Sequence, residues 1–443
     1  MTPAALEAVR RAIADADPLP VTGTVVRAAG LLLEAALPRV PVGTGCEIRA
    51  ADGTEVMAEV VGFTGGTARL MPLGEIHGVG EGCTVVPRAS ADRIPVGPAL
   101  LGRIVDAALR PVDGGPPPIL PDRARLHAAP PPAMARRRVS RPVALGIRAI
   151  DACLTVGEGQ RLAILAGPGV GKSVLLGMLA RSADADAVVV GLVGERGREV
   201  RDFVERDLGA GLSRSVVVVA TSDESPLKRV RAALVATTIA EHLRAGGRRV
   251  LLLIDSLSRV AQAQREIGLA AGEPPTTKGY PPSAFAILPR LLERAGNDGG
   301  SGSVTGFYTV LAEGDDPTDP VADAAKATLD GHVVLARSLA EAGHFPAVDV
   351  LASISRVMND VVGPEHRELA RQVREVLATY REAADLVDVG AYVPGSNPRI
   401  DRALRCIQAV RAVLRQAPEE RSTLDETLQA VRTALAAAEA SHG

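Results

Sequence analysis

The stretch Ala166-Gly167-Pro168-Gly169-Val170-Gly171-Lys172-Ser173 decides the fold of this chain of 443 residues. An apolar run at 162–166, typical of a strand, precedes it, and a helical segment at 172–183 follows it. In that setting the pattern is a P-loop, whose glycines let backbone N–H groups and the start of the helix point at one anion. The predicted phosphate-binding residues are Gly167, Pro168, Gly169, Val170, Gly171, Lys172, Ser173 and Val174.

The residues at the end of the loop, together with a second strand, predict a site for ATP and Mg²⁺. Lys172 would reach the β- and γ-phosphates, and the Ser173 hydroxyl would bind Mg²⁺. The apolar run 250–254 ends in Asp255, a carboxylate that can hold a water molecule of the Mg²⁺ shell. A helix-capping role is the alternative for Asp255. Ala166 stands where the first glycine of the pattern is usual, and its methyl group is tolerable if the residue ends the strand.

Two further charged motifs are ambiguous from spacing alone. Glu195 follows the apolar run 187–193, which we expect beside the P-loop strand, so its carboxylate could orient or deprotonate the attacking water. A charged run of this kind is also commonly a solvated turn. Arg356 lies far along the chain from the P-loop. It is either a surface charge or an arginine finger that stabilises charge on the phosphoryl group in a neighbour's active site.

Hydrophobic patterns predict an α/β fold in which a P-loop core of the RecA type at 91–362 follows a small N-terminal β-barrel at 18–90. From 139 onward, apolar strands alternate with helical segments, which indicates a largely parallel sheet. The Pro-rich stretches 114–120 and 128–133 indicate an extended linker. The predicted barrel runs are 23–36, 46–49, 55–61, 68–72 and 83–86, and the predicted sheet strands are 162–166, 187–193, 215–220, 250–254, 304–311 and 332–335.

Both ends of the chain are predicted to be helical. Residues 363–443 lack strand character and form a C-terminal helical domain, with helices expected at 365–387, 399–415 and 421–438. Residues 1–17 carry Leu6, Val9 and Ile13 at helical spacing, so an amphipathic helix or a frayed terminus is expected there.

Composition narrows the class of protein. Apolar residues make up 47% and charged residues 23% of the chain, and the net charge of −2 gives no reason to expect a nucleic-acid partner. The four cysteines show no metal-binding spacing, and we expect free thiols in a reducing compartment. The sequence offers neither a membrane-spanning apolar run nor a secretory signal, so a cytoplasmic protein is predicted.

Three longer stretches resemble one family. They are GERGREV at 194–200, IDSLSRVAQAQREIGLAAGEPPTTKGYPPSAFAILPRLLERAGN at 254–297 and DGHVVLARSLAEAGHFPAVDVLASISRVM at 330–358. Together they resemble the ATPases of type III protein export, in the flagellar and virulence-secretion branches, which are related to the catalytic subunit of rotary ATP synthases. The resemblance extends from about residue 21 to the C-terminus, and the loop 272–283 is its most specific part.

The resemblance implies roles for single residues. Glu195 matches the catalytic glutamate that activates water, with Arg196 as its neighbour at the site. Arg356 matches a finger supplied to the adjacent subunit. Phe345 matches an aromatic residue that stacks on adenine, and Asp255 keeps its Mg²⁺ role. Lys278 and Tyr280 lie in a loop that faces the central pore of a ring in this family.

The resemblance also implies partners and a location. It implies a homohexamer with ATP sites at subunit interfaces and a coiled-coil stalk protein in the pore. A peripheral-stalk-like regulator would bind the N-terminal helix, and export chaperones and substrates would be delivered to a gate in the membrane. The protein would then be cytoplasmic and peripherally associated with the export apparatus of the inner membrane.

Two positions depart from the family pattern. Val413 stands where relatives commonly have a phenylalanine near the base, which implies a looser adenine pocket. Leu145 replaces a usual threonine, and we expect little effect from that change.

Four other functions are alternatives to flagellar export. A virulence or symbiosis secretion ATPase shares every motif above, and the flagellar branch is favoured as the more widespread one. A rotary ATP synthase subunit would carry an acidic lever loop, but 390–399 contains no acidic residue. An RNA helicase would stack bases on aromatic residues, but Phe63 is the only aromatic residue among the first 90. A non-catalytic subunit would need Glu195 or Lys172 replaced.

Overall fold

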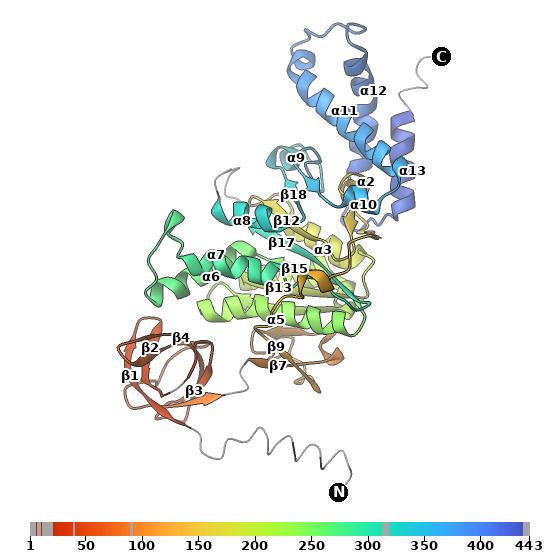
Figure 1. The fold of residues 1–443 in the computed structure, drawn as a ribbon. Helices are drawn as coiled ribbons and strands as arrows, with labels where there is room; N and C mark the ends of the chain where they lie inside the picture. Colours follow the sequence, from red (N-terminus) through yellow and green to blue (C-terminus); the bar gives the residue numbers. More distant parts are fainter. Residues whose placement is uncertain are drawn as a thin grey trace.

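The computed structural model describes residues 6, 10, 21–38, 40–88, 92–311 and 319–436. The amphipathic helix predicted at 1–17 therefore lies outside the described residues, apart from Leu6 and Arg10. The described chain forms a β-barrel, a central α/β domain and a group of helices at the opposite end of the molecule from the barrel (Figure 1). The predicted fold class is confirmed.

The barrel closes through six antiparallel strands in the order β1-β2-β5-β4-β3-β6. Apolar side chains that alternate along each strand fill its interior, which includes Leu33, Ile48, Val60 and Leu70. The predicted run 23–36 is two strands, because Gly30 takes a φ of +60° and turns the chain back on itself. The strands are β1 (Gly23–Ala29), β2 (Leu32–Ala36), β3 (Gly45–Arg49), β4 (Glu55–Thr64), β5 (Thr67–Pro72) and β6 (Thr84–Arg88).

The central sheet has nine strands, with the order β19-β18-β12-β17-β15-β13-β14-β8 and β16 paired to β17. Neighbours from β18 to β8 are parallel, and their Val- and Leu-rich sequences are buried on both faces. The strands are β8 (Ile104–Asp106), β12 (Arg161–Ala166), β13 (Ala187–Glu195), β14 (Ser215–Thr221), β15 (Arg249–Asp255), β16 (Gly296–Asn297), β17 (Ser303–Leu311), β18 (Gly331–Leu335) and β19 (Ile354–Ser355).

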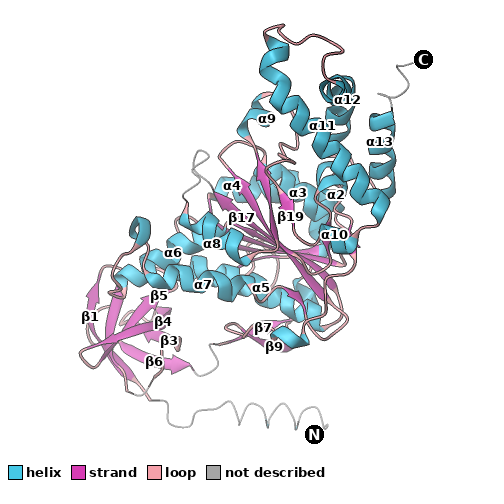
Figure 2. Cartoon of the chain, turned by 45° about the horizontal axis from the view of Figure 1, so that its top comes forward, coloured by secondary structure: helices cyan, strands magenta, loops and turns pink. Residues whose placement is uncertain are grey.

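Helices cover both faces of this sheet (Figure 2). One face packs on α5 (Pro226–Ala245), α6 (Leu257–Ala270), α7 (Pro282–Leu292) and α8 (Pro320–Thr328). The other face packs on α2 (Arg148–Cys153), α3 (Lys172–Ser182), the short helix η3 (Phe203–Leu208) and the C-terminal helices. Three further short helices are α4 (Gly197–Asp202), α9 (Arg337–Glu341) and α10 (Met358–Val361).

Two expectations about this sheet were wrong. Strand β13, predicted beside the P-loop strand β12, is separated from it by β17 and β15. After β12 the chain forms β13, and the two strands that lie between them in the sheet, β15 and β17, come later in the sequence. The sequence of a single strand does not reveal this order. Strands β8, β16 and β19 were not predicted at all. They contain three, two and two residues, which is too short for a hydrophobic pattern to develop.

The C-terminal helices are α11 (Pro364–Asp388), α12 (Pro398–Leu414) and α13 (Leu424–Ala436). Their buried faces meet one another and α2, so this domain continues the core of the central sheet. Helix α13 begins three residues later than predicted, because Thr423 and Glu426 form a reciprocal capping box at its start.

The Pro-rich linker has no helix or strand at 115–121 and 128–132. Between these stretches, strand β9 (Asp122–Arg125) pairs antiparallel with β7 (Arg93–Val96), which precedes the linker, and both strands pack against α5. The cysteines are free thiols, with Cys83 half-buried and the other three buried. Within the described ranges, no helix is long and apolar enough to cross a membrane.

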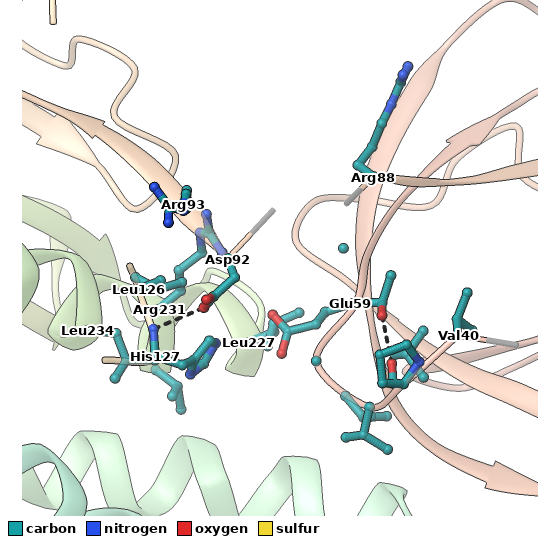
Figure 3. Close-up of a pocket in the computed structure, with 18 of the residues that line it drawn as sticks. Val40, Glu59, Arg88, Asp92, Arg93, Leu126, His127, Leu227, Arg231 and Leu234 are labelled. Carbon is teal, nitrogen blue, oxygen red and sulfur yellow. Dashed lines mark hydrogen bonds between the residues drawn. The ribbon is translucent and has the colours of Figure 1, made fainter. Parts of the chain in front are cut away.

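A crevice of about 2020 Å³ separates the barrel from the central domain. Glu59 lies on the barrel wall, and Asp92, His127 and Arg231 lie on the wall opposite (Figure 3). Burial raises the pKa of the Glu59 carboxyl to about 7, with Asp92 adding to the shift and Arg231 opposing it. Burial also lowers the pKa of His127.

We expect the substitution Glu59→Gln to stabilise the protein at pH 8 and to have a smaller effect at pH 5. The folded chain binds the Glu59 proton more tightly than the unfolded chain does. The contribution of Glu59 to stability is therefore largest below its ordinary pKa and is lost as the pH rises through about 7. Urea midpoints of both proteins at the two pH values test this. An equal difference between the two urea midpoints at pH 5 and pH 8 would contradict a raised pKa of Glu59.

Candidate active site

The P-loop occupies the turn between β12 and α3. Ala166 is the last residue of β12, so its methyl group is accommodated as the sequence required. Gly169 and Gly171 take φ values of +77° and +88°, a conformation in which a side chain would be strained. Helix α3 starts at Lys172, so its first N–H groups face the loop. Val170 is buried, so its contact with a ligand is limited to its backbone, whereas Ser173 and Val174 are exposed.

Lys172 lies between two carboxylates at the carboxyl edge of the sheet. Its Nζ is 2.5 Å from Oδ1 of Asp255 and 3.0 Å from Oε1 of Glu195. Asp255 ends β15 and Glu195 ends β13, and these parallel neighbours place Leu192 opposite Asp255. Lys172 follows β12, and β17 and β15 lie between β12 and β13. The lysine side chain is long enough to reach Glu195 across them. The structure thus brings together Lys172, Glu195 and Asp255 as predicted, despite the wrong strand order.

Burial and charge act together on this group. Burial raises the pKa of the Glu195 carboxyl above its usual range, and the charge of Asp255 adds to the shift, while Lys172 opposes it. Burial lowers the pKa of Lys172, but Asp255 and Glu195 outweigh that effect and keep the ammonium charged. A carboxylate whose pKa is raised towards neutrality is suited to accept a proton from water.

Asp255 is also held from its other side. The Thr309 hydroxyl on β17 donates a hydrogen bond of 2.6 Å to Oδ1 of Asp255, and Thr309 is fully buried. The oxygens of Asp255 and Ser173 are hard ligands of the kind that Mg²⁺ takes together with phosphate and water. The donor set therefore fits Mg²⁺, and Thr309 fixes the orientation of one donor.

We expect Thr309→Val to weaken Mg²⁺ binding on the order of 10-fold, because loss of a hydrogen bond to a metal-binding group typically has that effect. Valine has the shape of threonine but cannot donate to Asp255. Titration of Mg²⁺ against the binding of a fluorescent nucleotide measures the change, and Thr309→Ser, which keeps the hydroxyl, is the control. Equal Mg²⁺ affinity of the valine variant and the unmodified protein would show that Thr309 does not orient Asp255.

Phe345 lies beside the P-loop of its own chain. A methyl group added to Gly171 would be 3.5 Å from two ring atoms of Phe345, a residue that is 43% exposed. The backbone oxygen of Phe345 accepts a hydrogen bond from the N–H of Gln416, which brings the segment after α12 to the same place. Val413, one turn earlier, is half-buried against the core.

Arg196 is not part of this group. Its side chain is 83% exposed and lies 3.7 Å from the carboxylate of Glu199. The structure instead places Arg259 near Glu195, because the first atoms of its side chain pack on Gly194. The Arg259 Nε is buried and has no hydrogen-bond partner within the part of the chain that the structure describes. The prediction from sequence missed Arg259, although its position in the first turn of the helix after Asp255 was a usable signal.

Arg356 lies at the opposite end of the sheet from the P-loop. It follows β19, which pairs Ser355 with Gly331, and its N–H donates to the oxygen of Asp330. Asp330 in turn bonds to Arg161, the first residue of β12, while the P-loop begins after Ala166. Five residues of strand span about 16 Å, which exceeds the length of an arginine side chain. Arg356 is exposed and cannot reach the P-loop of its own chain.

The loop that contains Lys278 and Tyr280 is mostly exposed and follows α6. The ring of Tyr280 packs under the guanidinium of Arg265 at 5.3 Å. Arg69 of the barrel donates to the oxygen of Ala271 at the start of the loop. The loop thus lies where the barrel meets the central domain, and its predicted place in a pore remains a prediction.

Comparisons with known proteins cover nearly all of the chain. Residues 25–88 match the beta-barrel domain of the ATP synthase alpha/beta family, residues 146–355 match the nucleotide-binding domain of that family, and residues 362–433 match the T3SS EscN ATPase C-terminal domain. The chain is 49% identical over 425 residues to the flagellum-specific ATP synthase of Pseudomonas aeruginosa, covering 95% of this chain and 94% of that protein.

Two further relatives come from type III secretion. The type 3 secretion system ATPase of Xanthomonas euvesicatoria is 49% identical over 409 residues, covering 92% of each chain. The assembled ATPase EscN of enteropathogenic E. coli, solved in complex with its central stalk EscO, superimposes with a TM-score of 0.87 at 40% identity. That match covers 93% of this chain and all of EscN.

Proposed function

We propose, from the premise that this chain belongs to the family of flagellum-specific ATP synthases and type 3 secretion system ATPases, that its hydrolysis of ATP drives protein export by the flagellar apparatus. The enzyme is a P-loop ATPase. The observation that carries the hydrolysis of ATP is the position of Lys172 between Glu195 and Asp255 beside a P-loop. The flagellar assignment is supported by the similarity to the flagellum-specific ATP synthase of Pseudomonas aeruginosa.

The site supports hydrolysis by attack of water on the γ-phosphorus. ATP phosphates on the loop would compete with the two carboxylates for Lys172, which would leave Glu195 free to take a proton from the attacking water. The bond between the γ-phosphorus and the bridging oxygen breaks, and ADP leaves with the electron pair. Ser173 and Asp255 would hold Mg²⁺, which supplies charge neutralisation between the phosphates when bound. Phe345 would stack on the adenine.

Arg356 is proposed to complete the site of an adjacent copy. It is exposed and about 16 Å along the sheet from its own P-loop, and within the described ranges its guanidinium bonds only to the backbone oxygen of Lys326. Arg356 cannot reach the active site of its own chain. In a ring, Arg356 of each subunit would act at the active site of the next subunit. A homohexamer with a central stalk protein is supported by the similarity to EscN in its assembled form.

The remaining partners rest on family resemblance. A regulator at the N-terminal helix, export chaperones with their substrates, and an export gate in the inner membrane are proposed for this chain in the cytoplasm. No nucleic-acid partner is proposed. Arg196 is proposed to act at the active site in the assembled ring, because its side chain is exposed in the single chain.

Deletion of the gene tests the export function directly. A strain without this protein should fail to release hook and filament proteins into the medium, and the wild-type gene should restore release. The Lys172→Ala form should not restore it, because the lysine that binds phosphate is lost. Normal flagellar export by the deletion strain would contradict the flagellar assignment, and loss of other secreted proteins would then indicate the virulence branch.

A further inference from the structure

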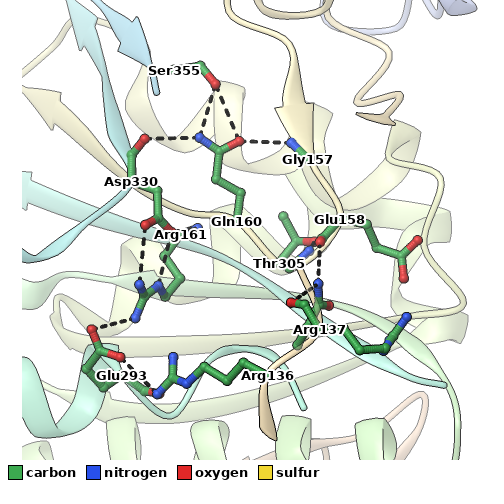
Figure 4. Close-up of polar contacts among 12 residues, drawn as sticks. Arg136, Arg137, Gly157, Glu158, Gln160, Arg161, Glu293, Thr305, Asp330 and Ser355 are labelled. Carbon is green, nitrogen blue, oxygen red and sulfur yellow. Dashed lines mark hydrogen bonds and ion pairs between the residues drawn. The ribbon is translucent and has the colours of Figure 1, made fainter. Parts of the chain in front are cut away.

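Gln160 is a buried amide just before the P-loop strand, and hydrogen bonds use its whole side chain. It has no exposed surface. Its Oε1 accepts from the N–H of Gly157 at 2.8 Å, and its Nε2 donates to the backbone oxygen of Asp330 at 3.2 Å and to the hydroxyl of Ser355 at 3.1 Å (Figure 4). A buried amide costs stability unless it is satisfied in this way, so these partners hold Gln160 in one orientation.

Two of the partners of Gln160, Asp330 and Ser355, also hold the backbone at Arg356. The oxygen of Asp330 accepts both from Gln160 and from the N–H of Arg356, the latter at 3.0 Å. Ser355, the residue before Arg356, donates its hydroxyl to the oxygen of Thr155 at 2.9 Å. The guanidinium of Arg356 makes one long hydrogen bond of 3.3 Å to the oxygen of Lys326 and is otherwise exposed. The backbone of Arg356 is fixed while its side chain faces solvent.

The sheet alone gives this segment little support. Strand β19 contains two residues at the edge of the sheet and pairs with β18 through Ser355 and Ile354. Strands this short are marginal without side-chain contacts. Gln160 donates both to Ser355, the residue before Arg356, and to the oxygen of Asp330, which also accepts from the N–H of Arg356.

We propose that Gln160 is a positioning residue for Arg356, and that it serves the active site of the adjacent subunit rather than its own. This inference rests on the shared site described under the proposed function. The position of Gln160 supports it: the residue lies before Arg161, at the end of β12 remote from the P-loop. A finger misplaced by about 1 Å can slow catalysis on the order of 100-fold without changing substrate binding.

The variants Gln160→Met and Ser355→Ala test this. Methionine has a similar volume but makes none of the hydrogen bonds of the Gln160 amide. Ser355→Ala removes only a hydroxyl, so it tests the proposal even if Gln160→Met folds poorly. Each should lower kcat by about 10- to 100-fold and leave the Kd for Mg-ATP within about twofold. Ser355→Thr, which keeps a hydroxyl, should lose far less. Gln372→Met, on the outer helices, is the matched control. An unchanged kcat in both test variants overturns the proposal.

Rings that contain two different variants show whether Gln160 acts on the active site of the adjacent subunit or on that of its own subunit. In a ring that contains equal amounts of Gln160→Met and Glu195→Gln subunits, about a quarter of the interfaces pair an intact Glu195 with an Arg356 that an intact Gln160 holds in place. Activity should therefore rise well above that of either variant alone. A mixture with Arg356→Ala subunits should show no rise, because both lack a working finger. If Glu195→Gln rescues Arg356→Ala but not Gln160→Met or Ser355→Ala, this inference is wrong. Failure of both rescues overturns the shared site itself.

Discussion

Replacement of Glu195 by glutamine should leave Mg-ATP binding intact and slow hydrolysis on the order of 10²–10⁴-fold, the usual contribution of a general base. The amide has the shape of the carboxylate, and its oxygen can still accept the hydrogen bond from Lys172. It cannot take a proton from water. Binding should be equal or somewhat tighter, because one negative charge is removed near the phosphates. Phosphate release at saturating ATP, with nucleotide binding measured by fluorescence, gives both quantities.

A matched variant controls for the loss of charge. Glu205 is exposed and pairs with Arg201 on a neighbouring helical segment, so Glu205→Gln should leave both kcat and Kd unchanged. Hydrolysis by Glu195→Gln within a few-fold of the unmodified protein would mean that another group activates the water, and the role of Glu195 would then be wrong.

Replacement of Arg356 by alanine should abolish most hydrolysis while nucleotide binding stays close to normal. Fingers supplied by a neighbour contribute on the order of 10³-fold or more to phosphoryl transfer. The residue is exposed, and its backbone N–H bond to Asp330 survives the substitution, so the fold should be unaffected. Steady-state rates across a range of protein concentrations measure the loss.

Two comparisons make this result specific. Arg356→Lys keeps the charge but loses the planar fork of donors, so it should recover only part of the rate. Arg399→Ala, which removes another exposed arginine on α12, should change nothing. If the lysine and alanine variants of Arg356 both hydrolysed ATP normally, Arg356 would be a surface charge.

The sequence predicted the parts of the site that local pattern encodes. The glycines at 169 and 171 are required by the backbone of the loop, and Asp255 and Glu195 follow apolar runs long enough to be recognised as strands. Parallel strands end at a common edge, and β13 and β15 are neighbours in the sheet, so Glu195 and Asp255 both lie within reach of Lys172. This is why the group formed as expected even though β13 was predicted in the wrong position.

The residues that were missed owe their place to contacts between distant parts of the chain. Thr309 and Gln160 are buried polar residues inside or beside apolar strands. Thr309 contacts Asp255, 54 positions away in sequence, and Gln160 contacts Asp330 and Ser355, 170 and 195 positions away. Nothing in the neighbouring residues marks such a contact. Arg196 shows the opposite case: it stands next to Glu195 in sequence, but successive residues point in different directions, and its side chain is exposed.

Mixing two inactive variants tests the central claim most directly, which is that each active site is built from two copies of the chain. Glu195→Gln subunits supply an intact Arg356, and Arg356→Ala subunits supply an intact Lys172 and Glu195. If the site is shared, the mixture should hydrolyse ATP at up to about a quarter of the unmodified rate. If every site were made by one chain, the mixture would stay as inactive as its components.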